Sequence, residues 1–148
     1  MGRFGNLGQA EISKGGVYFE QGAHLVEIKS VSYVEGRHDE FFCIEAEVKE
    51  TDSDMRVGTV ASQMIKMSLD SSAGNIKAFL AAALEVDDPK NFTPGDGQTV
   101  DQFWEQAAEE AIDQGNPMGG LLMHLRCETV QTKAGKPFTK HFWGPVAA

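Results

Sequence analysis

Residues 119–148 read GGLLMHLRCETVQTKAGKPFTKHFWGPVAA, a pattern of two alternating strands joined by a turn at Lys133-Ala134-Gly135-Lys136. The segment has a charge of +3 from four basic residues and one acid: Arg126, Lys133, Lys136 and Lys140, and Glu128. Residues 1–118 carry −12, in a chain whose net charge is −9. A basic hairpin with aromatic residues can attract phosphates and stack bases. The alternative is a solvated edge hairpin whose rings face the core.

Length and composition indicate one globular domain. A chain of 148 residues buries about 68–70% of its unfolded surface, enough for a core. Cys43 and Cys127 fall inside apparent strands, which favours two buried thiols in a reducing cytoplasm over a disulfide. No apolar run approaches the roughly 20 residues of a membrane span, and the start has no signal-peptide pattern. We therefore expect a cytoplasmic protein without membrane contact.

The first half of the chain predicts three strands. Residues 1–16 are glycine-rich and read as an irregular arm. A β-like stretch from Val17 to Val34 is broken near Gln21-Gly22, where a bend lets one strand serve two sides of a curled sheet. After a polar turn, alternation over residues 42–48 predicts a half-buried strand. Residues 57–68 predict a third strand, whose alternation leaves its inner face open.

The period then changes from two to 3.6. Apolar residues at helical spacing predict a first helix, with Ser71 or Ser72 as its cap and Asp87-Asp88-Pro89 as its end: Ile76, Phe79, Leu80, Ala83 and Leu84. A second helix begins near Thr99 and ends before Gly115. Its predicted buried residues are Val100, Phe103, Trp104, Ala107 and Ala111, and its acidic face carries Glu105, Glu109, Glu110 and Asp113.

The order of strands, helix and strands predicts a single mainly β (α+β) domain spanning residues 1–148. It consists of a five-stranded antiparallel barrel with a helix after the third strand, a helical insert at 87–118 and a closing hairpin at 119–146.

The sequence does not predict an enzyme. No nucleophile, base or cofactor loop can be named, and we expect no cofactor. The four histidines are scattered, and no metal-binding spacing is present, so no metal site is predicted. His124 and His141 fall on the same hairpin. A cross-strand pair on a nucleic-acid face or a solvated edge explains them better than half a zinc site.

Binding of single-stranded nucleic acid has more candidates, because Lys and Arg follow phosphates and aromatic rings stack on bases. They are Tyr33, Arg37 and Phe41 around the first strand turn, Lys66 on the third strand, and Arg126, Lys133, Lys136, Lys140 and Trp143 in the hairpin.

Alternation divides the aromatic residues into two groups. If Phe42 faces the core, its neighbour Phe41 faces out. We predict that Phe41 and Trp143 stack bases, with the Trp143 ring projecting beside Gly144-Pro145, and that the packed rings are Phe42, Phe79 and Trp104. In the last strand, Lys140 shares a face with two aromatic residues, Phe138 and Phe142. Trp143 lies on the opposite face, with Thr139 and His141, and the sequence leaves open which face is wet.

Several short phrases resemble phage-encoded single-stranded DNA-binding proteins of the OB-fold class. They are Gly22-x-His24-x-Val26-x-Ile28-x-x-Val31, Phe41-Phe42-x-Ile44-Glu45-x-Glu47-Val48, Asn75-Ile76-Lys77-x-Phe79-Leu80 and Lys133-Ala134-Gly135-Lys136-Pro137-Phe138. The resemblance covers about residues 17–86 and 119–146. It implies an OB-like barrel that coats single-stranded DNA, largely without sequence preference, in phage replication or recombination in the host cytoplasm.

Two features depart from that family. Members often end in an acidic tail that recruits partners, whereas this chain stops at Trp143-Gly144-Pro145-Val146-Ala147-Ala148. The acidic helix at 99–113 is the candidate replacement, and three roles are open for it: a lid, a homo-oligomer contact, or a site for replication or recombination proteins. The alternative function is a phage structural or protein-interaction module without nucleic-acid binding, which the net charge of −9 favours.

Overall fold

The computed structural model describes residues 17–88, 92–95, 97–131, 135 and 137–146. Its elements are β1 (Gly22–Glu35), β2 (Glu40–Thr51), β3 (Val60–Lys66), α2 (Ser72–Ala83), α3 (Val100–Ala111), β4 (Leu122–Gln131) and β5 (Pro137–Pro145). The prediction of a mainly β chain, with strands before and after the helices in the sequence, is confirmed. The predicted arm at 1–16 lies outside the described residues.

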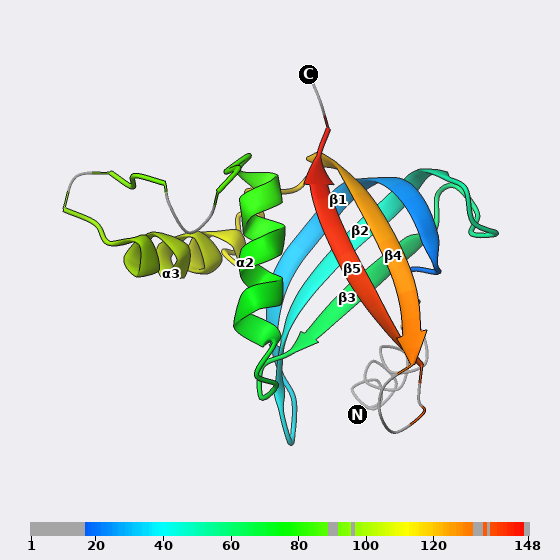
Figure 1. The fold of residues 1–148 in the computed structure, drawn as a ribbon, viewed down its shortest axis with the longest axis horizontal. Coiled ribbons are helices and arrows are strands. Elements are labelled where there is room, and N and C mark those ends of the chain that lie inside the picture. Colours follow the sequence, from blue (N-terminus) through cyan, green and yellow to red (C-terminus); the bar gives the residue numbers. More distant parts are fainter. Residues whose placement is uncertain (1–16, 89–91, 96, 132–134, 136, 147–148) are drawn as a thin grey trace.

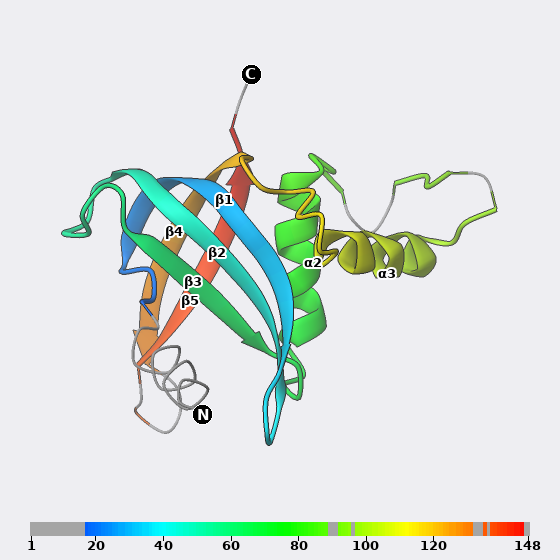
Figure 2. The same ribbon diagram turned by 180° about the vertical axis from the view of Figure 1, so that it is seen from behind.

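The five strands form one antiparallel sheet in the order β3-β2-β1-β4-β5. The sheet is strongly curled, so that β3 and β5 approach each other from its two ends (Figures 1 and 2). Within the part of the chain that the structure describes, no ladder joins these two strands. The structure is therefore an open, curled sheet where the sequence predicted a barrel.

β1 makes the curl by pairing on both sides. From His24 to Glu35 it pairs with β2, and its first half, Gly22–Glu27, pairs with β4. Two register shifts in the β1–β2 ladder bend it, one at Leu25/Val26 and one at Ile28/Ser30, because a bulge increases local twist. The predicted long strand divides at Gly22, whose φ is 139°. A Cβ there would lie 2.5 Å from Asp52 Oδ1, so glycine is required.

The segment before Gly22 contacts the opposite end of the sheet. Tyr18 forms a parallel bridge with Ser62 of β3, whose N–H donates to the Val17 carbonyl at 2.8 Å. Phe19 is buried. The prediction that residues 17–34 pair on two sides of a curled sheet is thus confirmed, with a break in the strand at Gly22.

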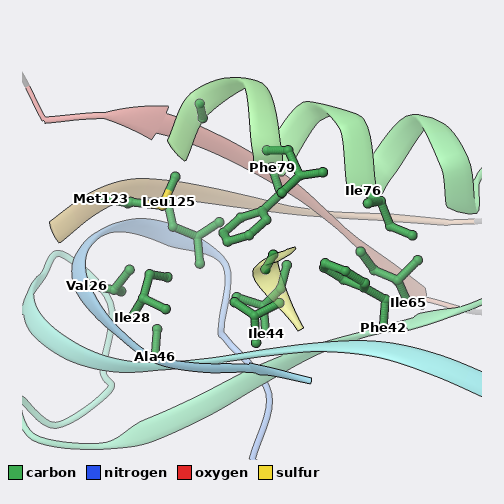
Figure 3. Packing of buried hydrophobic residues seen from close by; sticks show 14 of the residues in the cluster. Val26, Ile28, Phe42, Ile44, Ala46, Ile65, Ile76, Phe79, Met123 and Leu125 are labelled. Carbon is green, nitrogen blue, oxygen red and sulfur yellow. The ribbon is translucent and has the colours of Figure 1, made fainter. Parts of the chain in front are cut away.

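The core fills the concave side of the sheet. Every second residue of β2 is buried there, as predicted: Phe42, Ile44, Ala46 and Val48. From α2, Phe79 packs at the centre of the core beside Leu125 of β4 and Phe42 (Figure 3). α2 contacts both β5 and β3, and so covers one end of the gap between them.

The helix boundaries agree with the sequence at one helix and differ at the other. α3 begins after Thr99 with a complete capping box, in which Thr99 and Gln102 exchange side-chain-to-backbone hydrogen bonds. α2 ends at Ala83, before the predicted stop at Asp87, and Glu85 turns the chain with a φ of 57°. Trp104 is buried as predicted and contacts the rings of Phe92 and Phe103. No helix among the described residues is long and apolar enough to cross a membrane.

Candidate functional site

The β4–β5 hairpin has one buried and one exposed face. Leu125 pairs with Trp143 and Cys127 with His141 on the core side. The outer face carries the alternate pairs, which are Arg126 with Phe142, Glu128 with Lys140 and Val130 with Phe138. The wet face of β5, which the sequence left open, is therefore the face of Phe138, Lys140 and Phe142.

Two exposed aromatic rings flank a lysine on this outer face. Phe138 is 46% exposed and Phe142 is 42% exposed, with exposed Lys140 between them. Four residues of strand separate the two rings by about 13 Å. We call these three residues the β5 row. Large apolar side chains that stay in water carry a cost that a binding partner removes.

Arg126 supplies a second cation beside the β5 row. Its guanidinium lies 4.4 Å from the centre of the Phe142 ring, an arrangement that orders both side chains. Arg126 also forms an ion pair with Glu128. The guanidinium is thus shared between a ring and a carboxylate, and Lys140 is the cation closest to the middle of the row.

A groove separates the facing edges of β3 and β5 and has a volume of about 260 Å³. Its rim includes two exposed aromatic residues, Tyr18 at 60% exposure and Phe138. Lys66 lies on the β3 side, and residues of the first turn of α2 line one wall. Phe138 therefore belongs both to the β5 row and to this groove, which makes them one continuous surface.

Of the residues predicted around the first strand turn, Phe41 lies beside Lys66 at the β3 side of the groove. Phe41 pairs with Lys66 across β2 and β3 and is half-buried, while Phe42 is buried in the core, as predicted. Tyr33 and Arg37 are exposed. Lys66, the strand partner of Phe41, connects Phe41 to the groove. Arg126 and Lys140 are connected to the groove through Phe138.

Acidic neighbours weaken the first-turn group as a phosphate site. Lys66 pairs with Asp39 at 3.5 Å, and the Ser68 hydroxyl, which donates to Asp39, is the main cause of the lowered pKa of that carboxyl. The Tyr33 hydroxyl donates to the Glu40 carboxylate, which raises the pKa of Tyr33 to about 12. Tyr33 is therefore protonated and already bonded at neutral pH.

The prediction that the Trp143 ring projects from the strand end is wrong. Its Nε1–H donates to Gln63 Oε1 at 2.8 Å, and its ring packs edge-on against Phe79, with ring centres 5.1 Å apart. The ring also meets Phe19 at 6.2 Å. The alternation of β5 puts Trp143 on the core face, so stacking on a base would require it to leave the core.

The two hairpin histidines do not form a cross-strand pair. His124 pairs with Gly144 and is exposed, whereas His141 pairs with Cys127 on the core face. Among the described residues, none forms a hydrogen bond with the buried His141 Nε2, and burial lowers the pKa of His141 to about 4. Lys133 and Lys136 of the predicted site lie outside the described residues, so the structure places seven of the nine predicted residues.

Two further lysines of the sheet already form ion pairs with carboxylates. Lys29 and Lys49 form four ion pairs with Glu27 and Glu47, at 3.0–3.4 Å. Hydrogen bonds from these lysines lower the pKa of both carboxyls. The network is neutral as a whole, so this part of β1 and β2 offers no net positive charge to a phosphate.

Tyr18 was not predicted from the sequence, and Phe138 and Phe142 were considered as hairpin rings but were not chosen as site residues. The alternation of Phe138 and Phe142 with Lys140 was a usable signal, but it does not say which face a core covers. Tyr18 had no signal of its own, because its position depends on the long-range bridge to Ser62.

No protein-family model matches this chain, and no curated protein is significantly similar to it. The resemblance to phage single-stranded DNA-binding proteins therefore stands on its short sequence phrases.

Proposed function

We propose that this protein binds single-stranded nucleic acid, in the first place DNA, along the β5 row and across the groove to Lys66. The observation that carries the proposal is the row itself, in which Phe138, Lys140 and Phe142 alternate with half-buried residues of β5 and stay in water. Aromatic rings stack on any base, and a cation between them neutralises the intervening phosphates. The expected binding is largely independent of sequence.

The topology supports an OB-like assignment as part of the proposal. A three-stranded meander, a helix, and a hairpin joined through β1 give the strand order β3-β2-β1-β4-β5. OB folds bind ligands over their second and third strands, between the loops that follow the first and fourth. In this chain those strands carry Phe41 and Lys66, and those loops contain Arg37, Lys133 and Lys136. The phage role in replication or recombination rests on the resemblance.

A binding assay with labelled oligonucleotides tests the proposal. Fluorescence anisotropy with a fluorescein-labelled dT oligonucleotide should give saturable binding, and a duplex of the same length should bind more weakly, because its bases are not free to stack. Replacing Phe138 and Phe142 together by Ala should remove most of the affinity. The matched control is Val57→Ala, since Val57 is an exposed apolar residue in the β2–β3 turn.

The competing function is a protein-interaction module. The acidic outer side of α3 favours it, with Glu105, Glu109 and Glu110 exposed. A protein of net charge −9 also repels polyanions at long range. If no single-stranded oligonucleotide binds at low salt, the β5 row is an apolar contact for another protein and the nucleic-acid proposal is abandoned.

A further inference from the structure

The groove between β3 and β5 differs from the open β5 row in shape and chemistry. It is a hollow between two strand edges, whereas the row is a convex strand face. Its lining combines ring, amide, hydroxyl and amine groups from β3, α2, β5 and the segment before β1, including Tyr18, Lys66, Ser71, Asn75, Phe138 and Thr139.

The polar groups of one wall are available to a ligand. Ser71 stands at the N-cap position of α2, but its side chain makes no capping hydrogen bond. Asn75, one turn further along, is half-buried and lines the same wall. An amide offers both donors and an acceptor, and a hydroxyl offers one of each. Together they can pair with the hydrogen-bonding edge of a planar heterocycle.

The two rims suit a flat ring. Tyr18 is bridged to Ser62 of β3 and Phe138 belongs to β5, so the two rings come from opposite ends of the sheet, and both border the groove. Exposed aromatic faces stack on bases, and a base held this way keeps its edge free for hydrogen bonds. Lys66 at the β3 side is placed for the phosphate of the same nucleotide, although it shares its charge with Asp39.

The size of the groove limits the ligand to one such unit. Pockets for drug-sized molecules span about 300–1,000 Å³, and the groove, at about 260 Å³, lies just below that range. A single nucleobase with part of its sugar suits this volume, whereas a stack of bases does not.

We infer that one base of the bound strand turns into the groove between β3 and β5, where Tyr18 or Phe138 stacks on it and Asn75 and Ser71 contact its edge. This inference rests on the proposed function and deepens it. The β5 row binds every sequence alike, and the groove adds a preference for one type of base at a single position.

The free strand edges suggest another occupant, an extended peptide that adds a strand to β3. Val17 and Tyr18 already occupy that edge at Ser62, however. The aromatic rims and the continuity with the β5 row through Phe138 favour a nucleotide. Binding of a peptide along this edge would contradict the inference.

The test compares four labelled oligonucleotides that consist of dT except for one central position, which is T, C, A or G. We expect one of the four to bind about fivefold more tightly than the weakest. A single net hydrogen bond gives a ratio of this size, and binding of the oligonucleotide in several positions reduces it in part. Asn75→Ala and Ser71→Ala should reduce this ratio toward one, because they remove the groups that would distinguish one base edge from another. Phe142→Ala is the control, because it should weaken all four equally.

Photocrosslinking gives a second readout that does not depend on the variants. An oligonucleotide with 5-iododeoxyuridine at the central position is irradiated, and mass spectrometry locates the linked residue. Linkage to Tyr18 with a base preference supports the inference, because Tyr18 lines the groove and is not part of the β5 row. Tight but equal binding of all four oligonucleotides, with crosslinks only at Phe138 or Phe142, overturns it and leaves the proposed function intact. Absence of all oligonucleotide binding, or binding of an extended peptide in the groove, overturns it as well.

Discussion

Trp143 of β5 donates its indole N–H to the side-chain oxygen of Gln63 on β3 at 2.8 Å. The two strands lie at opposite ends of the sheet and share no ladder in the described part of the chain. This side-chain bond therefore joins the two edges that a closed barrel would join through its backbone. Gln63 is buried, so its amide oxygen depends on this partner.

Trp143→Phe should destabilise the fold without weakening oligonucleotide binding. The variant leaves a buried amide unpaired, which costs about 1–3 kcal/mol. Urea unfolding of Trp143→Phe, Gln63→Leu and the double variant forms a cycle that isolates the pair. If the double variant loses the sum of the two single effects, the bond contributes nothing. Loss of affinity with unchanged stability would restore the base-stacking role that the packing of Trp143 argues against.

The aromatic residues of β5 and β2 should separate binding from stability. Phe142→Ala and Phe138→Ala should each cost about 1–3 kcal/mol of binding with little change in unfolding free energy, because both rings are exposed. Phe42→Ala should instead cost about 3–5 kcal/mol of folding, because Phe42 is buried in the core. Anisotropy and urea unfolding on the same preparations measure both quantities.

Phe41→Ala tests the β2 side of the same surface. Phe41 is half-buried and faces away from the core, so we expect about 1–3 kcal/mol of lost binding and only a small loss of stability. A large loss of stability with unchanged DNA affinity of the folded protein would assign Phe41 to packing alone.

Salt should weaken binding in proportion to the number of phosphates that the basic residues contact. Each contact contributes about −0.7 log units of affinity per log unit of salt on a single strand. Lys140→Ala should reduce the slope by about one contact, and Lys133→Ala with Lys136→Ala by about two. Lys49→Ala is the matched control, since Lys49 is held by Glu27 and Glu47. If the slope of log affinity against log salt is the same in all these variants, the hairpin does not contact phosphates and is a solvated edge.

The stability of the protein should fall as the pH drops from 6.5 toward 4. Burial lowers the pKa of His141 from 6.5 to about 4. In that interval the unfolded chain binds a proton at this histidine and the folded chain does not, so protonation favours unfolding. The full effect is about 3 kcal/mol, present above pH 6.5 and lost by about pH 4. His141→Gln should flatten this part of a plot of unfolding free energy against pH, whereas His124→Gln, at an exposed site, should not.

The two thiols should be inert in the native protein. Burial raises the pKa of Cys43 and raises that of Cys127 to about 12, and both cysteines are free. Because the thiolate is the reactive form, a disulfide reagent such as DTNB should label neither until urea unfolds the chain. Fast labelling of native protein would mean that the β4 or β2 region opens locally.

Interactions between residues close in the chain determine several secondary-structure elements of this protein without any tertiary contact. The period of two over residues 42–48 places Phe42 and Ile44 on one face of a strand, and the period of 3.6 from Ile76 to Ala83 makes a helix. The start of α3 follows from Thr99 and Gln102, because a capping box is completed within four residues. Each of these features depends on neighbours close in the chain.

Only the tertiary structure decided which face of β5 is wet. Alternation assigns Phe138, Lys140 and Phe142 to one face and His141 and Trp143 to the other, but it is symmetric between them. The choice comes from Phe79 of α2 and from Phe19, which pack against Trp143 and cover that face. The groove has the same origin, since Tyr18 and Phe138 border one hollow only because β1 bends and the sheet curls. These are contacts between residues far apart in the chain, and no local pattern encodes them.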